Sequence, residues 1–515
     1  MNHFKKVSLL LIILSIFLIA CGGGAPETVE EAVEDASQAV EEAAEAVEEA
    51  VEEVVEPEVV DELVCEDAIG CVEVDAGDPI RIASALVVTG PNESLGLDSQ
   101  YGVEIALADR GELFGHPLEL QPEDDGCSAE GGQTAGQKIV SDPTIAGIIG
   151  TSCSGAGVPM SQIVCEAGIA MISPSNTAPV LTDEGSRQSC YFRTAHNDTI
   201  QGAAMADYVF NTLGLTKAAA IHDGDPYTEG LASSFSNAFQ ELGGEIVAFE
   251  AEAADATNVE PILTSVAAAE PELIYFPVFI PLGSLIAKTA QEVDGLDGVQ
   301  LAAADGVLSP DFLEAAGDAA EGMILSGPDL NFGNSIYDTF LETYQAEYGT
   351  EPTAPFHAHA YDATNMLLNG IEAVAQVDDA GNMLIGRQAL IDALQATEGM
   401  PGITGTITCL PNGDCADPQI AVSEVQGGEF VSIWAMGEGA MMDDDSMEDD
   451  AMAGGNMVDE LVCDDAIGCV EIDAGDPLRI ASALVVTGPN ESLGLDSQYG
   501  VEIALADRGE LLGLP

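Results

Sequence analysis

The sequence contains very few basic residues. Its 515 residues include 12 Lys and Arg against 90 Asp and Glu, which gives a formal net charge of -78 at pH 7. A surface of this kind repels the phosphates of nucleic acids and the headgroups of anionic membranes. We therefore expect no nucleic-acid partner.

The sequence also lacks the common catalytic and metal-binding motifs. Neither GxSxG nor HExxH occurs, and no CxxC pair or convergent histidine cluster suggests zinc. His357 and His359 form the only close histidine pair, and a spacing of two places them on different faces of a helix. Ser154 has no evident base in the sequence. We therefore expect no enzyme, no metal ion and no cofactor.

The N-terminal apolar run is too short and too near the terminus for a permanent membrane span. Two lysines precede residues 7–19, and the run ends in Leu-Ile-Ala-Cys, which resembles the lipobox of bacterial lipoproteins. The resemblance implies a lipoprotein signal peptide at residues 1–21, with cleavage before Cys21 and lipidation of that residue. An ordinary signal peptide with a fortuitous cysteine is the alternative. We expect a protein outside the cytoplasm, lipid-anchored to the outer face of the cell membrane.

Residues 22–59 form an acidic tether with 14 acidic residues and no basic ones. Valines recur every seven residues in it, as in an amphipathic helix that pairs with another helix. We favour an extended spacer over this helix, because unbalanced glutamates repel one another and small side chains bury little area. Either structure would give the following domain reach.

The C-terminal part combines a linker with a repeat. Residues 436–457 are rich in Met and Asp and are typical of a flexible linker. Residues 458–515 then repeat residues 60–117 with five differences over 58 residues. The second copy is too short to form its own core, so we interpret it as a truncated second domain. An unfolded fragment, or one that swaps into a first-copy sheet, is the alternative.

Export makes disulfides more plausible than zinc for the cysteines. Apart from Cys21, eight cysteines precede the linker, and eight cysteines allow about 105 pairings. Local spacing suggests the pairs Cys65–Cys71, in a lead-in at residues 60–78, and Cys409–Cys415. The spacing does not settle the pairing of Cys127, Cys153, Cys165 and Cys190.

Alternating strand and helix patterns begin at Ile80 and continue for about 350 residues, which exceeds one sheet domain. We therefore expect an α/β fold with two lobes. The stretch 147–177 contains two buried strands, each followed by a turn of small polar residues, with a helix that begins at about Val158. Neighbouring turns at the carboxyl ends of parallel strands and a helix N-terminus can bind a carboxylate.

Nine segments in the same order resemble the branched-chain amino acid binding proteins of ABC transporters, the leucine/isoleucine/valine-type periplasmic binding proteins. These segments are TGPNESLGLDSQYGVEIALAD (89–109), EDDGC (123–127), IIGTSCSGA (148–156), AMISPSNTAPVLT (170–182), FRTAHND (192–198), IHDGDPYTEGLA (221–232), AADGVLSPDF (303–312), AGDAAEGM (316–323) and the segment 355–361. The resemblance implies two Rossmann-like lobes with parallel sheets, joined by three crossovers in a type I periplasmic binding protein fold. The substrate-binding domain would be residues 79–435, with lobe 1 at 79–195 and 327–404 and lobe 2 at 196–326 and 405–435.

The same resemblance implies the ligand-binding residues. Ser154 would hold a ligand carboxylate, Ser175 and Thr177 would bind carboxylate and ammonium, and Asp305 would bind the ammonium. Tyr227 and Tyr361 would line the cleft, and Phe279 replaces a family tyrosine. The family's disulfide corresponds to Cys127–Cys153, which leaves Cys165–Cys190 as a pair.

The resemblance implies a substrate-binding lipoprotein of an ABC importer. The expected ligand is a branched-chain or other aliphatic amino acid, or a similar small zwitterion, and the expected partners are ABC permease subunits in the membrane. Relatives with this fold also bind short amides, urea or aromatic acids. A sensory lipoprotein that reports the same ligand to a partner is a further alternative.

Overall fold

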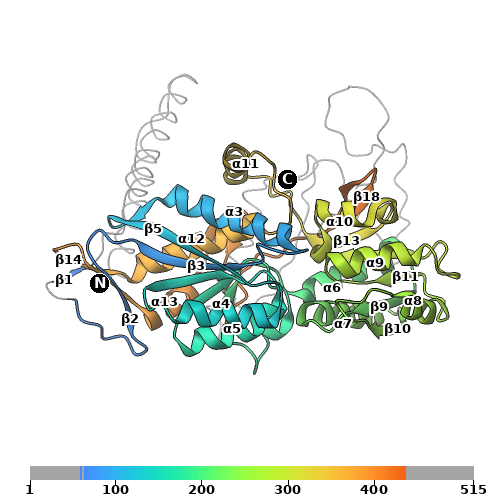
Figure 1. Ribbon diagram of the computed structural model, residues 1–515, viewed down its shortest axis with the longest axis horizontal. Helices are drawn as coiled ribbons and strands as arrows, with labels where there is room; N and C mark the ends of the chain where they lie inside the picture. The colour runs from blue at the N-terminus through green and yellow to red at the C-terminus, as the bar shows by residue number, and fades with distance from the viewer. Residues whose placement is uncertain (1–57, 61–62, 437–515) are drawn as a thin grey trace, which may run out of the picture. The chain divides into compact units, whose positions relative to one another are not determined.

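Two helix-covered sheets organise the part of the chain that the computed structural model describes, which is residues 58–60 and 63–436 (Figure 1). The predicted signal peptide with Cys21, nearly all of the acidic tether, and residues 437–515 with the linker and the repeat lie outside these residues. The α/β fold with two lobes is confirmed, and the chain passes three times between the sheets.

The sheet of the first lobe has six strands. In spatial order they are β4 (Glu112–Leu113), β5 (His116–Asp124), β3 (Ile80–Leu86), β6 (Ile145–Gly150), β7 (Ala170–Ser173) and β8 (Tyr191–Arg193). The pairs from β5 to β8 are parallel, and every residue of β6 is buried, as expected for an apolar strand covered on both faces. Parallel pairing brings the carboxyl ends of β6 and β7 to one edge of the sheet.

Helices cover both faces of this sheet, and in Figure 1 β3 lies between the two layers. One layer contains α3 (Glu93–Arg110) and α12 (His357–Val374), and the other contains α4 (Ala129–Val140) and α5 (Ser154–Glu166). The lobe is completed by α11 (Ser335–Tyr348), α13 (Arg387–Gln395) and the hairpin of β16 (Met400–Gly402) and β17 (Gly405–Ile407).

The predicted lead-in, residues 60–78, belongs to the first lobe. A small sheet combines β1 (Glu58–Val60), β14 (Gln376–Asp378), β15 (Met383–Gly386) and β2 (Cys71–Val74). Val72 and Val74 are buried in the same core as β3 and β6. The boundary drawn between the tether and the lead-in at residue 59 is therefore wrong, because β1 already pairs with β14.

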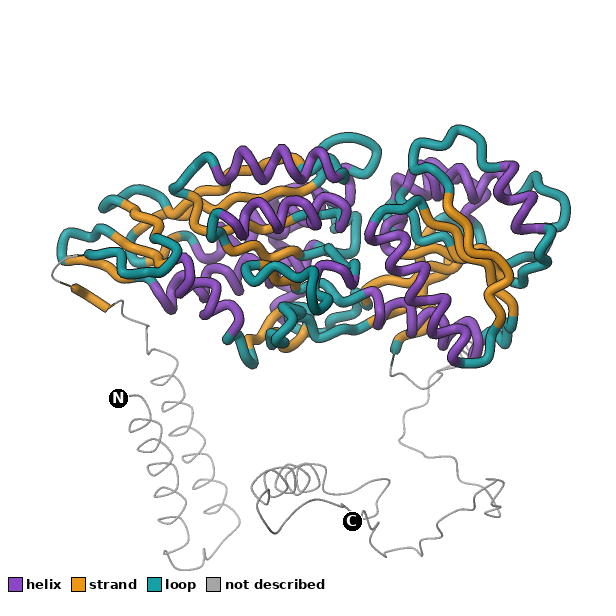
Figure 2. The backbone as a smooth tube through the Cα atoms, turned by 90° about the horizontal axis from the view of Figure 1, so that it is seen from below, coloured by secondary structure: helices purple, strands orange, loops and turns teal. Residues whose placement is uncertain are grey.

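The sheet of the second lobe has seven strands. In spatial order they are β10 (Glu245–Ala251), β9 (Lys217–His222), β11 (Leu273–Tyr275), β12 (Gln300–Ala304), β13 (Ile324–Pro328), β18 (Ile420–Gln426) and β19 (Glu429–Ala435). Its main helices are α6 (Asp198–Asp207), α7 (Pro226–Glu241), α8 (Glu260–Ala267), α9 (Ile280–Ala290) and α10 (Pro310–Ala316). In Figure 2 the strands of both sheets run between helices.

Two of the predicted lobe boundaries are corrected. The predicted boundary between residues 326 and 327 falls inside β13, whose pairing with β12 and β18 places it wholly in the second lobe. The predicted boundary between residues 404 and 405 is too early, because Ile407 and Cys415 are fully buried in the core of the first lobe. The first lobe is therefore residues 58–60, 63–195 and 329–415, and the second is residues 196–328 and 416–436.

The structure contains the four predicted disulfides. Two close loops of similar length, Cys127–Cys153 over 26 residues and Cys165–Cys190 over 25 residues. Cys65–Cys71 and Cys409–Cys415 each join residues six apart. No group of three His, Cys, Asp or Glu side chains within residues 58–60 and 63–436 is arranged to hold a metal ion. Within the same residues no helix is long and apolar enough to cross a membrane.

Candidate ligand-binding site

A small cavity of about 30 Å³ lies where residues from both lobes meet at the carboxyl ends of their strands. Its lining combines hydroxyl groups, aromatic rings and one carboxylate, and consists of Leu95, Ser152, Cys153, Ser154, Ser175, Tyr227, Phe279, Asp305, Gly306 and Phe356. Five of the seven predicted ligand residues are among them. The structure thus brings together side chains that are up to 261 residues apart in the sequence.

A larger hollow of about 1040 Å³ lies beside α11, but its chemistry is less suited to a zwitterion. Its lining includes the acidic side chains Asp329, Glu342 and Glu351, which would repel a ligand carboxylate. In the smaller cavity the first lobe contributes the serine hydroxyls, which form the hydroxyl end, and the second lobe contributes a single carboxylate, which forms the carboxylate end. The smaller cavity is therefore the candidate site.

Ser154 lies at the hydroxyl end of the cavity because α5 begins there. Cys153 is the N-cap of α5, so the helix starts earlier than the predicted Val158. The prediction was wrong because the small residues after Cys153 were interpreted as a loop, whereas they form the first turn of the helix. The Ser154 hydroxyl accepts a hydrogen bond from the Ala178 amide at 3.2 Å. A helix N-terminus with a hydroxyl group is suited to bind an anion.

The turn after β7 is joined to the turn after β6 by hydrogen bonds. Ser173 and Asn176 donate to the Thr151 carbonyl at 2.8 and 2.9 Å, and the Ser175 hydroxyl donates to the Ser152 carbonyl at 3.0 Å. The two turns therefore form one rigid wall, as expected for neighbouring parallel strands.

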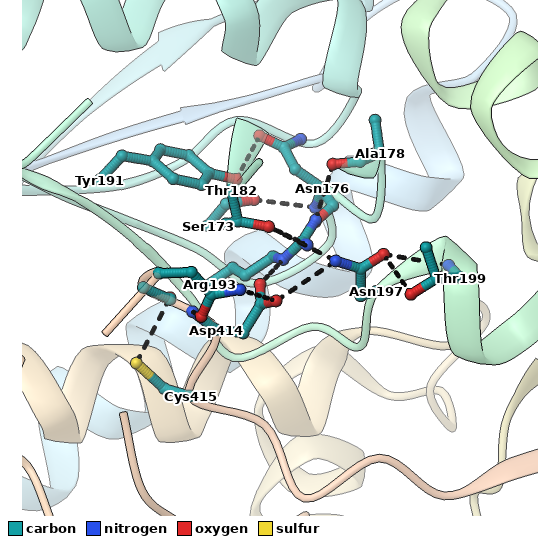
Figure 3. Close-up of polar contacts among 12 residues, drawn as sticks. Ser173, Asn176, Ala178, Thr182, Tyr191, Arg193, Asn197, Thr199, Asp414 and Cys415 are labelled. Carbon is teal, nitrogen blue, oxygen red and sulfur yellow. Dashed lines mark hydrogen bonds and ion pairs between the residues drawn. The ribbon is translucent and has the colours of Figure 1, made fainter. Parts of the chain in front are cut away.

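Arg193 supports this wall from behind (Figure 3). Its fully buried guanidinium donates to the carbonyls of Asn176 at 3.1 Å and Ala178 at 2.9 Å, and it pairs with Asp414. Asn197 also donates to Asp414, at 3.2 Å. Two crossovers between the lobes are thereby fixed next to the turn that carries Ser175. No role was predicted for Arg193 and Asp414, which are 221 residues apart.

Asp305 provides the carboxylate end of the cavity, directly after β12. Its Oδ1 accepts a hydrogen bond from Gln201 Nε2 at 2.6 Å and faces the Tyr227 hydroxyl at 3.4 Å. Burial raises the pKa of Asp305 to about 6, although the Gln201 hydrogen bond lowers it. The group is still mostly ionised at neutral pH and can bind a cation.

Aromatic rings line a further wall of the cavity, beside the wall formed by the two turns and the carboxylate of Asp305. The Tyr227 and Phe279 rings lie 5.3 Å apart between centroids, and the Tyr227 hydroxyl accepts a hydrogen bond from the Gly306 amide at 3.0 Å. Leu95 and Phe356 complete this wall and were missed as site residues. Both fall inside segments that carry the family resemblance, but neither has the polar chemistry that marks a ligand contact.

Thr177 is buried behind the lining residues rather than among them. Its carbonyl accepts a hydrogen bond from the Asp198 amide at 2.9 Å. Burial, followed by the charge of Asp305, raises the pKa of Asp198 well above its usual value. Thr177 therefore borders the carboxylate end of the site, and contact with a ligand remains a prediction.

The structure does not bring Tyr361 to the cavity. Its hydroxyl donates to Asp109 at 3.0 Å, and its ring packs against Phe340 of α11. The prediction that Tyr361 lines the cleft is therefore wrong, and Phe356 supplies the aromatic side chain of this segment instead. Phe356 precedes α12, whereas Tyr361 lies more than one helical turn inside it, on a face directed to α3 and α11.

The fold and the cavity define a two-lobed α/β protein with a candidate ligand site between the lobes. The family model for periplasmic binding proteins matches residues 79–429, so the chain belongs to the periplasmic binding protein family.

Named relatives bind amino acids. The chain is 26% identical over 357 residues to Leu/Ile/Val-binding protein homolog 3 of Brucella melitensis, covering 69% of this chain and 93% of that protein. It is 28% identical over 306 residues to the leucine-, isoleucine-, valine-, threonine- and alanine-binding protein of Pseudomonas aeruginosa, covering 59% and 80%. The crystal structure of the leucine binding protein LivK of Thermotoga maritima matches with a TM-score of 0.63 and 26% identity, covering 70% of this chain and 99% of that chain.

Proposed function

We propose that the protein captures an aliphatic amino acid, with a branched-chain side chain as the best fit, in the cavity between its lobes. The observation that carries this proposal is that Ser154, at a helix N-terminus of the first lobe, and the carboxylate of Asp305, from the second lobe, line the same cavity. A zwitterionic amino acid has its two charged groups about one Cα apart and needs this pair of partners. The amino acids named for the relatives support the same ligand class.

The side chain of the ligand would lie against Leu95, Tyr227, Phe279 and Phe356. This wall offers mostly carbon atoms, because the hydroxyl of Tyr227 is used by Gly306. An apolar wall favours leucine, isoleucine or valine over polar amino acids, since burial of each methylene group contributes about 0.8 kcal/mol.

Ligand entry would require the lobes to separate. The cavity of about 30 Å³ has the volume of one liquid water molecule, which is less than an amino acid occupies. The three crossovers between the lobes would absorb the change in backbone angles, as hinge segments do in ligand closure. The structure would then correspond to the closed arrangement of the two lobes.

The physiological role we propose is delivery of the bound amino acid to permease subunits of an ABC importer, from a position outside the cytoplasm. Lipidation at Cys21 would keep the protein at the membrane. A sensory lipoprotein would use the same site and the same ligand chemistry. Loss of amino-acid uptake after deletion of the gene would favour transport over sensing.

Calorimetry with L-leucine, L-isoleucine, L-valine, urea and acetamide tests the proposal. We expect the aliphatic amino acids to bind and the neutral ligands to bind weakly, because the latter leave Asp305 without a cation. Asp305→Asn should weaken L-leucine binding by about 10- to 100-fold, since a charge-assisted hydrogen bond contributes about 1.5–3 kcal/mol.

Asp318→Asn is the matched control, because Asp318 is an exposed carboxylate in the same lobe and should leave the affinity unchanged. Tighter binding of urea or acetamide than of any amino acid would reject the proposed ligand class. Unchanged leucine affinity in Asp305→Asn would remove Asp305 from the site.

A further inference from the structure

One carboxylate of the second lobe lies against the helix N-terminus that the ligand is proposed to use. Asp225 is the N-cap of α7, and its Oδ1 accepts a hydrogen bond from the Tyr227 amide at 2.9 Å. Tyr227 lines the cavity, so Asp225 is two residues away from the candidate site. One of its oxygens is therefore used within its own helix.

The second oxygen of Asp225 reaches the first lobe. A Cβ atom placed on Gly155 would lie 1.9 Å from Asp225 Oδ2 and 3.0 Å from its Cγ. Gly155 is in the first turn of α5, where backbone N–H groups have no acceptor within the helix. Burial raises the pKa of Asp225 to about 6, and the charge of Asp223 also raises it, while the amides of Tyr227 and Gly155 lower it. The carboxylate thus faces the N-termini of two helices from different lobes.

This contact explains the glycine at position 155. Its three nearest atoms beyond the helix are all in the Asp225 carboxylate, and a side chain of any size would occupy the position of Oδ2. Glycine otherwise weakens a helix by about 1 kcal/mol relative to alanine. The absence of a side chain therefore allows the close approach of a carboxylate from the other lobe.

A second polar contact joins the lobes nearby. The hydroxyls of Ser94, in the first turn of α3, and Ser309, the N-cap of α10, lie 2.8 Å apart. Both contacts must break when the lobes separate. In the open arrangement the Asp225 carboxylate would contact water instead of the N-terminus of α5. In the closed arrangement it would again lie at the positive end of the α5 dipole.

We propose that Asp225 is a positioning residue that stabilises the closed arrangement of the lobes, as a latch, by capping α5 across the interface. Gly155 provides the space and the backbone amide that the Asp225 carboxylate contacts. The ligand carboxylate would use Ser154 and the Ser175 turn, next to the latch. The inference concerns closure, and it rests on the proposed function only for the choice of ligand in the binding test.

A double-mutant cycle in the full chain tests the latch with L-leucine as the probe. Asp225→Ser retains a hydroxyl that can cap α7 but has no second oxygen to reach α5. We expect it to weaken L-leucine binding about tenfold, mainly through faster dissociation, because the closed form loses a charge-assisted contact. Gly155→Ala should weaken binding more than Asp225→Ser, because the added methyl group meets the carboxylate.

The combined variant distinguishes a latch from two independent effects. In Asp225→Ser the space beside Gly155 is open, so adding Gly155→Ala should leave the affinity near that of Asp225→Ser alone. Effects of the two substitutions that simply multiply would overturn the proposal. Circular dichroism and melting temperatures establish that each variant is folded.

Small-angle X-ray scattering without ligand keeps the test independent of the proposed function. We expect a smaller radius of gyration for the unsubstituted chain than for either single variant. Equal radii for the unsubstituted chain and both single variants would overturn the latch. If the unsubstituted chain binds no aliphatic amino acid, the proposed function fails, and the comparison of radii alone decides for or against the latch.

Discussion

The two lobes border the same cavity but are stabilised by different interactions. All four disulfides join residues of the first lobe, and residues 196–328 and 416–436 contain no cysteine. Every ion pair of a Lys or Arg among the described residues is also in the first lobe: Arg81 with Glu119 and Asp142, Arg110 with Glu372, Lys138 with Glu123, and Arg193 with Asp414.

The second lobe is stabilised mainly by apolar packing. Phe235 is fully buried and packs against two other rings. Its ring centroid lies 5.5 Å from that of Phe239 and 4.6 Å from that of Tyr275. A second apolar cluster around Ile274 and Phe312 packs on the other face of the sheet. The two lobes therefore contribute differently to the cavity. The first lobe, which contains the disulfides, fixes the hydroxyl wall, which is formed by the turns after β6 and β7. The second lobe supplies the carboxylate of Asp305 and the rings of Tyr227 and Phe279.

Loss of the buried Arg193 guanidinium should have the largest effect. Arg193→Met leaves Asp414 without its cation and frees the carbonyls of Asn176 and Ala178. We expect the free energy of unfolding of the first lobe to fall by about 3–5 kcal/mol, since breaking a buried pair leaves an uncompensated charge. Urea unfolding measures the loss, and the exposed Lys288→Met in the second lobe serves as the control, with an expected change below about 0.5 kcal/mol. Equal losses in the two variants would contradict the difference between the lobes.

Removal of one long disulfide should have the next largest effect. Cys165→Ser combined with Cys190→Ser removes the disulfide that joins residues 25 apart in the sequence. Chain-entropy arguments predict that the free energy of unfolding falls by about 3 kcal/mol. The matched variant without Cys409–Cys415 should lose about 2 kcal/mol, because its loop is shorter. Hydrogen exchange should show faster exchange in the first lobe only. Faster exchange in the strands of the second lobe would show that the lobes unfold as one unit.

The smallest effect, taken for one group and one pH unit, should be a pH dependence that both lobes share. Burial raises the pKa of Asp125 in the first lobe to about 7 and that of Asp305 in the second to about 6. Between the unfolded value near 3.9 and these values the folded chain binds more protons than the unfolded chain, so stability falls as the pH rises. We expect the free energy of unfolding to fall by about 1 kcal/mol per pH unit for each titrating group between pH 5 and 7. A melting temperature that rises over this range would contradict these shifts.

Several parts of the site could be predicted from the sequence because they depend on local pattern. The buried strands that become β6 and β7 are short apolar runs, and each is followed by small polar residues. Parallel pairing then forces the two turns to the same edge. Ser154, Ser175 and Asp305 follow from this rule, since each lies directly after a strand or at the start of the helix that follows it.

Other parts could not be predicted because they depend on contacts between distant residues. The ion pair of Arg193 and Asp414 requires two crossovers to meet. The error at Tyr361 arose because the resemblance places a segment at the cleft, whereas the direction of each side chain depends on how α12 packs against α3 and α11. The lobe boundary after Cys415 likewise depends on which core buries Ile407.

The sequence by itself determined the two-lobed α/β class, the strand-and-turn pattern of the hydroxyl wall and the types of residue available to bind a zwitterion. Hydrophobic periodicity, turn residues and the order of motifs can be identified in the sequence without knowledge of the tertiary structure. The tertiary structure alone decided that Asp305 faces Gln201 and Tyr227, that Arg193 supports the wall, and that Asp225 reaches Gly155. These contacts depend on the angle and register at which separate helices and strands pack, and no local pattern specifies them.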